Sequence, residues 1–238
     1  MLHGPQRGIF DLDFQIPAAC ADEVASGAAD IGIIPSFELT RQELEIIPGA
    51  GIACHGPVRS ILLISARPAA EIRRLAVDSS SRTSVQLARV LLERRFGATP
   101  ELIAHPPDLD SMLRIADAAL IIGDPALRIE PSHLPYHVYD LGKEWVEMTG
   151  LPFVFAVWAG RKSVITPEVV EAFQKSCRYG RERIEEIVTA ESGRREIAPD
   201  LVREYLNRHI VHELGPRDYE GMDLFLSYAR RAAPRAAL

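Results

Sequence analysis

Cysteine is scarce in this sequence, and the few cysteines form no recognisable site. Cys20, Cys54 and Cys177 are widely separated, and no two of them have the spacing of metal ligands. Each lies among small or apolar residues, so we expect buried free thiols and neither disulfides nor a cysteine-bound metal. His209 and His212 share one face of an expected helix, but no third ligand lies nearby in the sequence. The sequence therefore predicts no metal site.

Long hydrophobic runs, a signal peptide and a basic stripe are absent as well. No apolar run approaches the length needed to cross a membrane, and the N-terminus has no basic region followed by an apolar stretch. These features predict a protein of the reducing cytoplasm with no membrane partner. Acidic residues outnumber basic ones, 33 to 27, so no nucleic acid partner is expected. The 238 residues, 47% of them hydrophobic, suffice for one large domain or two small ones.

The most informative stretch is the hydroxyl-rich segment at residues 78–84. It follows an apolar run, 75–77, that is typical of a strand end, and it precedes a run with apolar residues at helical spacing. Five hydroxyl residues and Arg82 therefore stand where a helix begins. The first turn of a helix has unpaired N–H groups and a partial positive charge, so the segment is suited to bind a carboxylate or a phosphate. The alternative is an unusually rich N-cap, although a cap needs only one such residue.

We identify Ser80, Ser81, Arg82, Thr83 and Ser84 as candidate substrate-binding residues. The hydroxyls and the guanidinium can each donate a hydrogen bond to an anion. For Arg82 the alternative is an ordinary surface residue at the start of a helix. The sequence shows no acid–base pair of the usual type, so no catalytic residue is assigned.

Strand-like and helical runs alternate along the chain, which indicates an α/β fold with mixed, mostly parallel sheets. The order of the strands predicts two lobes. Residues 1–66 and 153–238 form the first lobe, and residues 67–152 form the second. The expected elements include a short strand at 14–16 and a continuous helix at 199–213.

Two further strand ends carry small polar residues that we assign to the same site. Ser36 follows an apolar strand and Pro35, and Gly123 with Asp124 closes the apolar strand at 118–122. Ligands of open α/β folds bind at the carboxyl ends of strands, so a cleft between two lobes would gather Ser36, Gly123 and the hydroxyl-rich segment. For Ser36 the alternative is a turn residue, and for Asp124 a helix cap is favoured over catalysis.

Several of these segments recur together in a known family. They lie at residues 30–36, 58–63, 78–84, 118–124, 139–142 and 149–159. With them the chain resembles the chorismate dehydratases, which open the futalosine route to menaquinone. The resemblance spans most of the chain, and the hydroxyl-rich segment is its most specific element.

The resemblance implies a two-lobed, type II periplasmic-binding-protein-like fold that is used as an enzyme. Such an enzyme would convert chorismate to 3-(1-carboxyvinyloxy)benzoate with loss of one water, and it would need neither a metal nor an organic cofactor. Chorismate carries two carboxylates, and the hydroxyl-rich segment suits one of them. Because the product ring is aromatic, the protein mainly has to orient the substrate and stabilise charge. The resemblance also implies that the enolpyruvyl carboxylate of the substrate takes the ring proton.

The N-terminus departs from the family pattern. Members begin with a strand and a Tyr-Leu-Asn-like turn, whereas residues 1–4 of this chain align with the end of that turn. We expect either a start codon assigned too late or an impaired member, and the first is favoured because the remaining motifs are present. The alternative function is that of a non-catalytic module of the same fold that binds small carboxylates.

Overall fold

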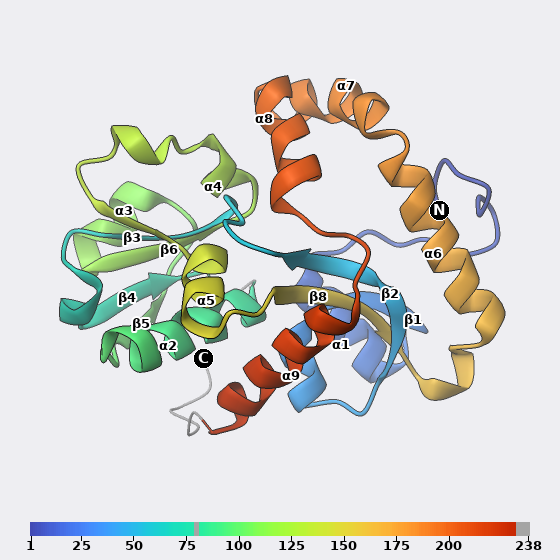
Figure 1. The fold of residues 1–238 in the computed structure, drawn as a ribbon, viewed down its shortest axis with the longest axis horizontal. Coiled ribbons are helices and arrows are strands. Elements are labelled where there is room, and N and C mark those ends of the chain that lie inside the picture. The colour runs from blue at the N-terminus through green and yellow to red at the C-terminus, as the bar shows by residue number, and fades with distance from the viewer. Residues whose placement is uncertain (79–80, 232–238) are drawn as a thin grey trace.

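The computed structural model describes residues 1–78 and 81–231, and it contains two β-sheets that lie side by side (Figure 1). The three-stranded sheet has the order β1-β8-β2, and the five-stranded sheet has the order β5-β4-β6-β3-β7. The strands are β1 (Ile31–Pro35), β2 (Glu45–Cys54), β3 (Ile61–Ser65), β4 (Arg74–Val77), β5 (Glu101–Ala104), β6 (Ala118–Ile122), β7 (His137–Asp140) and β8 (Phe153–Gly160).

Helices surround both sheets. They are α1 (Pro17–Ser26), α2 (Arg82–Phe96), α3 (Leu109–Ile115), α4 (Asp124–Arg128), α5 (Leu141–Thr149), α6 (Pro167–Arg181), α7 (Ile184–Arg195), α8 (Pro199–Glu204) and α9 (Pro216–Arg231). The chain also forms the 3-10 turn η1 (Ser36–Thr40) after β1 and the π-helical turn η5 (Tyr205–His209) after α8. Among the described residues, none of the helices is long and apolar enough to span a membrane.

The chain passes between the two sheets twice. The first crossing, 55–60, joins β2 to β3, and the second, 150–152, joins α5 to β8 (Figure 1). β3 pairs with β6 and β7 inside the five-stranded sheet. We therefore propose that the first lobe ends before β3, and that the boundary expected at residue 66 moves to this crossing.

Parallel and antiparallel pairs both occur, as the sequence predicts, but antiparallel pairs outnumber the parallel pairs that were expected to dominate. The five-stranded sheet is mixed, and the three-stranded sheet is antiparallel throughout. β4 pairs in parallel with β5 and β6. The pairs β1–β8, β2–β8, β3–β6 and β3–β7 are all antiparallel. β3 and β8 are the strands that follow the two crossings, and each enters its sheet against the direction of its neighbours. The alternation of strands and helices in the sequence does not record this direction.

The second crossing is held by an aromatic cluster. Trp145, Phe153 and Phe225 are completely buried, and their rings meet edge to face with centroids 4.9, 5.2 and 6.0 Å apart. Trp145 Nε1 donates to the carbonyl oxygen of Pro152 at 3.0 Å. These residues lie on α5, β8 and α9, so the cluster fixes the crossing to elements of both sheets.

The three cysteines are free, as the sequence predicts. Cys54 is completely buried, and this burial raises the pKa of its thiol to about 12. Cys20 and Cys177 are only partly buried, although burial raises the pKa of both thiols as well. The expectation of full burial therefore holds for Cys54 and not for the other two.

The short strand expected at 14–16 does not form. Phe14 is 73% exposed and Ile16 is 58% exposed, and neither belongs to a strand. Among the described residues, β1 pairs only with β8. A three-residue strand needs a neighbouring strand for its backbone hydrogen bonds, and none of the described strands pairs with residues 14–16.

The continuous helix expected at 199–213 ends early. α8 stops at Glu204, η5 follows, and Ile210 begins an extended segment. Val211 and Ala53 exchange two backbone hydrogen bonds of 2.8 and 2.9 Å, so the segment covers the outer edge of β2. Covering a sheet edge stabilises this segment more than continuing the helix, and the β-branched residues at 210 and 211 favour an extended backbone.

Candidate functional site

The described end of the hydroxyl-rich segment, residues 81–84, forms the N-terminus of α2, as the sequence predicts. Ser81 occupies the N-cap position, but its hydroxyl makes no capping bond and donates instead to the hydroxyl of Ser84 at 2.8 Å. By contrast, α3, α5 and α6 are capped by the side chains of Asp108, Asp140 and Thr166. The N-cap side chain of α2 thus leaves the N–H groups of the first turn for another acceptor, such as an anion.

Gly123 lies at the same edge of the five-stranded sheet as Ser81. β4 and β6 run in parallel with Val77 opposite Leu120, so the chain leaves both strands on one side. Gly123 has a φ of +66°, which favours glycine, and its N–H donates to the carbonyl oxygen of Ser60 at 2.8 Å. Two of the three predicted strand ends are therefore neighbours.

The third strand end, carried by η1, contacts α2 directly. The N–H of Phe37 donates to Thr83 Oγ1 at 3.2 Å. Ser36 is completely buried, and its hydroxyl donates to the carbonyl oxygen of Val154 on β8 at 2.7 Å. The structure therefore brings η1 and α2 together, but it directs the Ser36 side chain into β8.

The described hydroxyls of the segment differ in access to solvent. Thr83 and Ser84 are buried, whereas Ser81 is partly exposed. Ser80 lies outside the described residues. A carboxylate that approaches the described part of this segment would meet Ser81 first, with Ser84 behind it.

Arg82 is bound by two carboxylates of the protein. Its two terminal nitrogens donate to the two oxygens of Asp22 at 3.0 and 2.9 Å, and Nη1 also donates to Glu38 at 3.1 Å. Hydrogen bonding to Arg82 lowers the pKa of the Asp22 carboxyl, and the same contact raises the pKa of the guanidinium. Arg82 thus joins α2 to α1 and η1.

Asp22 and Glu38 belong to this site and were missed by the sequence analysis. Glu38 is 1% exposed, and its carboxylate also accepts from Gln42 Nε2 at 3.2 Å. The signal in the sequence was a glutamate between the apolar residues Phe37 and Leu39, directly after a strand. A charged residue in such a position indicates a buried side chain that needs a partner.

Arg59 lies in the first crossing, and Asp124 follows the end of β6. The side chains of both contact other parts of the protein. Arg59 has a φ of +66°, and its guanidinium donates to the carbonyl oxygens of Ala126 and Leu127 at 3.0 and 3.5 Å. Asp124 begins α4 and pairs with Arg195 of α7 at 2.8 Å. The contacts of Arg59 fix α4 beside the first crossing, and the ion pair of Asp124 fixes α4 to α7.

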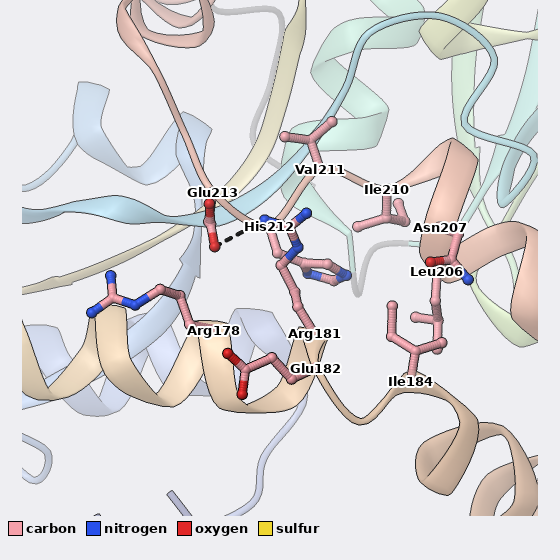
Figure 2. Close-up of a pocket in the computed structure, with 10 residues that line it drawn as sticks. All are labelled: Arg178, Arg181, Glu182, Ile184, Leu206, Asn207, Ile210, Val211, His212 and Glu213. Carbon is pink, nitrogen blue, oxygen red and sulfur yellow. Dashed lines mark ion pairs between the residues drawn. The ribbon is translucent and has the colours of Figure 1, made fainter.

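A cavity of about 600 Å³ lies between the end of α6 and the segment that follows η5 (Figure 2). It is lined by Arg178, Arg181, Glu182, Ile184, Leu206, Asn207, Ile210, Val211, His212 and Glu213. Arg181 pairs with Glu213 at 2.9 Å beside the His212 ring, whose pKa is lowered by burial. None of the predicted site residues that the structure describes lines this cavity. Within residues 1–78 and 81–231, no group of three or more His, Cys, Asp or Glu side chains could hold a metal ion.

Sequence comparison shows the relatives of this chain. A family model described as menaquinone biosynthesis matches residues 5–231. The chorismate dehydratase of Thermus thermophilus is 32% identical over 209 residues, which cover 80% of this chain and 76% of that protein. The chorismate dehydratase of Campylobacter jejuni is 25% identical over 213 residues, which cover 89% of this chain and 80% of that protein.

Structural comparison shows the fold. A structural genomics target from Archaeoglobus fulgidus has a TM-score of 0.68 at 17% identity. The match covers 92% of this chain and 84% of that protein. The periplasmic aliphatic sulphonate binding protein SsuA of Escherichia coli has a TM-score of 0.62 at 15% identity. The match covers 92% of this chain and 75% of that protein. These likenesses confirm the periplasmic-binding-protein-like fold that the sequence predicts. The length and identity of the sequence matches establish that the chain belongs to the menaquinone biosynthesis family and is a relative of the chorismate dehydratases.

Proposed function

We propose that this chain is a lyase that dehydrates chorismate to 3-(1-carboxyvinyloxy)benzoate, in the futalosine route to menaquinone. The observation that carries the proposal is the N-terminus of α2, where Ser81 and the first-turn N–H groups stand at the carboxyl ends of β4 and β6. Family membership supports the same substrate. The proposal includes a cytoplasmic location and neither a metal nor an organic cofactor.

In this proposal the residues of the site bind and orient the substrate. One carboxylate of chorismate accepts hydrogen bonds from the first-turn N–H groups of α2 and from the Ser81 hydroxyl, which turns to it from Ser84. The helix dipole also favours a negative charge there. At the neighbouring strand end, a Cβ on Gly123 would meet nothing within 4 Å. We therefore place the ring of the substrate on the side of Gly123.

The dehydration of the bound substrate needs no acid or base from the protein in this proposal. A proton leaves one ring carbon and the hydroxyl leaves the adjacent carbon. The C–H electrons form the new ring double bond, and the proton and hydroxide together make one water. We propose that the enolpyruvyl carboxylate of the substrate takes the proton, so the protein contributes by holding this carboxylate near the ring. Formation of the aromatic ring supplies the driving force.

Incubation of the chain with chorismate, without added metal, is expected to yield an aromatic enol ether. Mass spectrometry of the product should show the loss of one water. Ser81→Ala is expected to lower kcat/KM by about 10-fold or more, because a hydrogen bond to a charged group contributes about 1.5–3 kcal/mol.

Two results would contradict the proposal. One is prephenate or 4-hydroxybenzoate as the only product. The other is chorismate that binds and is recovered unchanged, which would favour the alternative of a non-catalytic module that binds small carboxylates.

A further inference from the structure

Glu38 is a buried carboxylate that links elements of the two sheets beside the proposed site. Its Oε1 accepts from Arg82, the first residue of α2, at 3.1 Å, and its Oε2 accepts from Gln42 at 3.2 Å. Arg41 adds a longer contact of 3.5 Å from the surface. A buried carboxylate is costly without such partners, so Glu38 is fixed by these groups and in turn fixes them.

The charge of Arg82 is compensated by the protein itself. Asp22 binds both terminal nitrogens of the guanidinium, and Glu38 binds one of them. A further anion at this guanidinium would lie close to two carboxylates, which repel it. A substrate carboxylate is therefore directed to Ser81 and to the N–H groups of α2, and away from the guanidinium.

We propose that Glu38 is a positioning residue, which fixes the first turn of α2 through Arg82 and thereby fixes Ser81 and Ser84 for substrate. The inference rests on the proposed function, which makes Ser81 a substrate contact. The hydrogen bond from the N–H of Phe37 to Thr83 is a second contact between η1 and α2. Loss of the Glu38 carboxylate therefore loosens the start of α2 without detaching it.

The test compares Glu38→Gln with Glu43→Gln, which removes an exposed glutamate from the loop that follows η1. Glu38→Gln is expected to raise the KM for chorismate by about 10-fold or more with a smaller change in kcat, because it disturbs substrate binding. Glu43→Gln is expected to leave both constants unchanged, and Glu38→Asp, which keeps the charge, to give an intermediate KM. If Glu38→Gln does not fold, Arg82→Lys tests the same contact.

Hydrogen–deuterium exchange over residues 81–92 gives a readout that does not depend on turnover. Faster exchange at the start of α2 in Glu38→Gln, and not in Glu43→Gln, together with the rise in KM, supports the inference. Faster exchange with an unchanged KM overturns it, because Glu38 would then stabilise the helix without positioning the substrate contacts. Unchanged exchange also overturns it. If the unmodified chain neither binds nor converts chorismate, the proposed function fails, and the exchange comparison still decides whether Glu38 anchors α2.

Discussion

Gly221→Ala is expected to lower the free energy of unfolding by about 3 kcal/mol or more, because the added methyl group has no space. A Cβ on Gly221 would lie 2.0 Å from the carbonyl oxygen of Pro152 and 3.1 Å from its carbon. These are backbone atoms of the second crossing, and the buried rings of Trp145 and Phe153 hold that crossing in place. Neither α9 nor the crossing can move away without disturbing the aromatic cluster.

Urea denaturation of the purified variants measures this effect. The matched control is Gly193→Ala in α7, where an added Cβ would meet nothing within 4 Å. That variant is expected to be more stable than the unmodified chain by about 0.5–1 kcal/mol, since alanine favours a helix more than glycine does. Equal effects of the two substitutions would show that α9 does not pack on the crossing as closely as described.

Arg82→Ala is expected to weaken both stability and substrate binding. Within residues 1–78 and 81–231, the substitution leaves Glu38, which is 1% exposed, with Gln42 and the longer contact to Arg41 as its partners. A charged group that loses its partner in a buried position costs about 1.5–3 kcal/mol, and the 26% exposure of the Arg82 side chain favours the lower end of this range. Chorismate binding should weaken by about 10-fold, because the first turn of α2 loses its attachment to α1 and η1.

Thermal unfolding and a chorismate titration measure the two effects. Arg89→Ala, on the same helix, is the control. Among the described residues, the Arg89 guanidinium makes a single hydrogen bond, of 3.4 Å to Gln86, so its loss should change stability by less than about 0.5 kcal/mol. Adding Glu38→Gln to Arg82→Ala should recover part of the lost stability, since it removes the uncompensated charge. Weaker binding with unchanged stability would mean that Arg82 contacts the substrate directly, and it would contradict a positioning role.

Signals that act between neighbouring residues mark several helix ends in the sequence. α1 ends at Gly27 and α5 ends at Gly150, and both glycines adopt the positive φ that terminates a helix. The hydroxyl-rich segment was found for the same reason, because the change from strand to helix at residue 82 is visible in the residues next to it. Features set by neighbours in sequence were therefore accessible without a structure.

Features set by distant partners were not accessible. The expected strand at 14–16 has no neighbour to pair with among the described residues, and the segment at 210–213 leaves its expected helix to cover β2. The partners of Arg82 are 60 and 44 residues away in sequence, at Asp22 and Glu38. Their proximity depends on how η1 and α1 pack against α2, which no local pattern records.

The position of a bound ligand tests the central claim most directly. A crystal structure of the chain with an unreactive analogue of chorismate, carrying both carboxylates, would show where each carboxylate lies. We expect one carboxylate within about 2.5–3.2 Å of the Ser81 hydroxyl and of the first-turn N–H groups of α2, with the ring beside Gly123. A ligand that occupies instead the cavity beside Arg181 and His212, with no density at Ser81, would contradict the account.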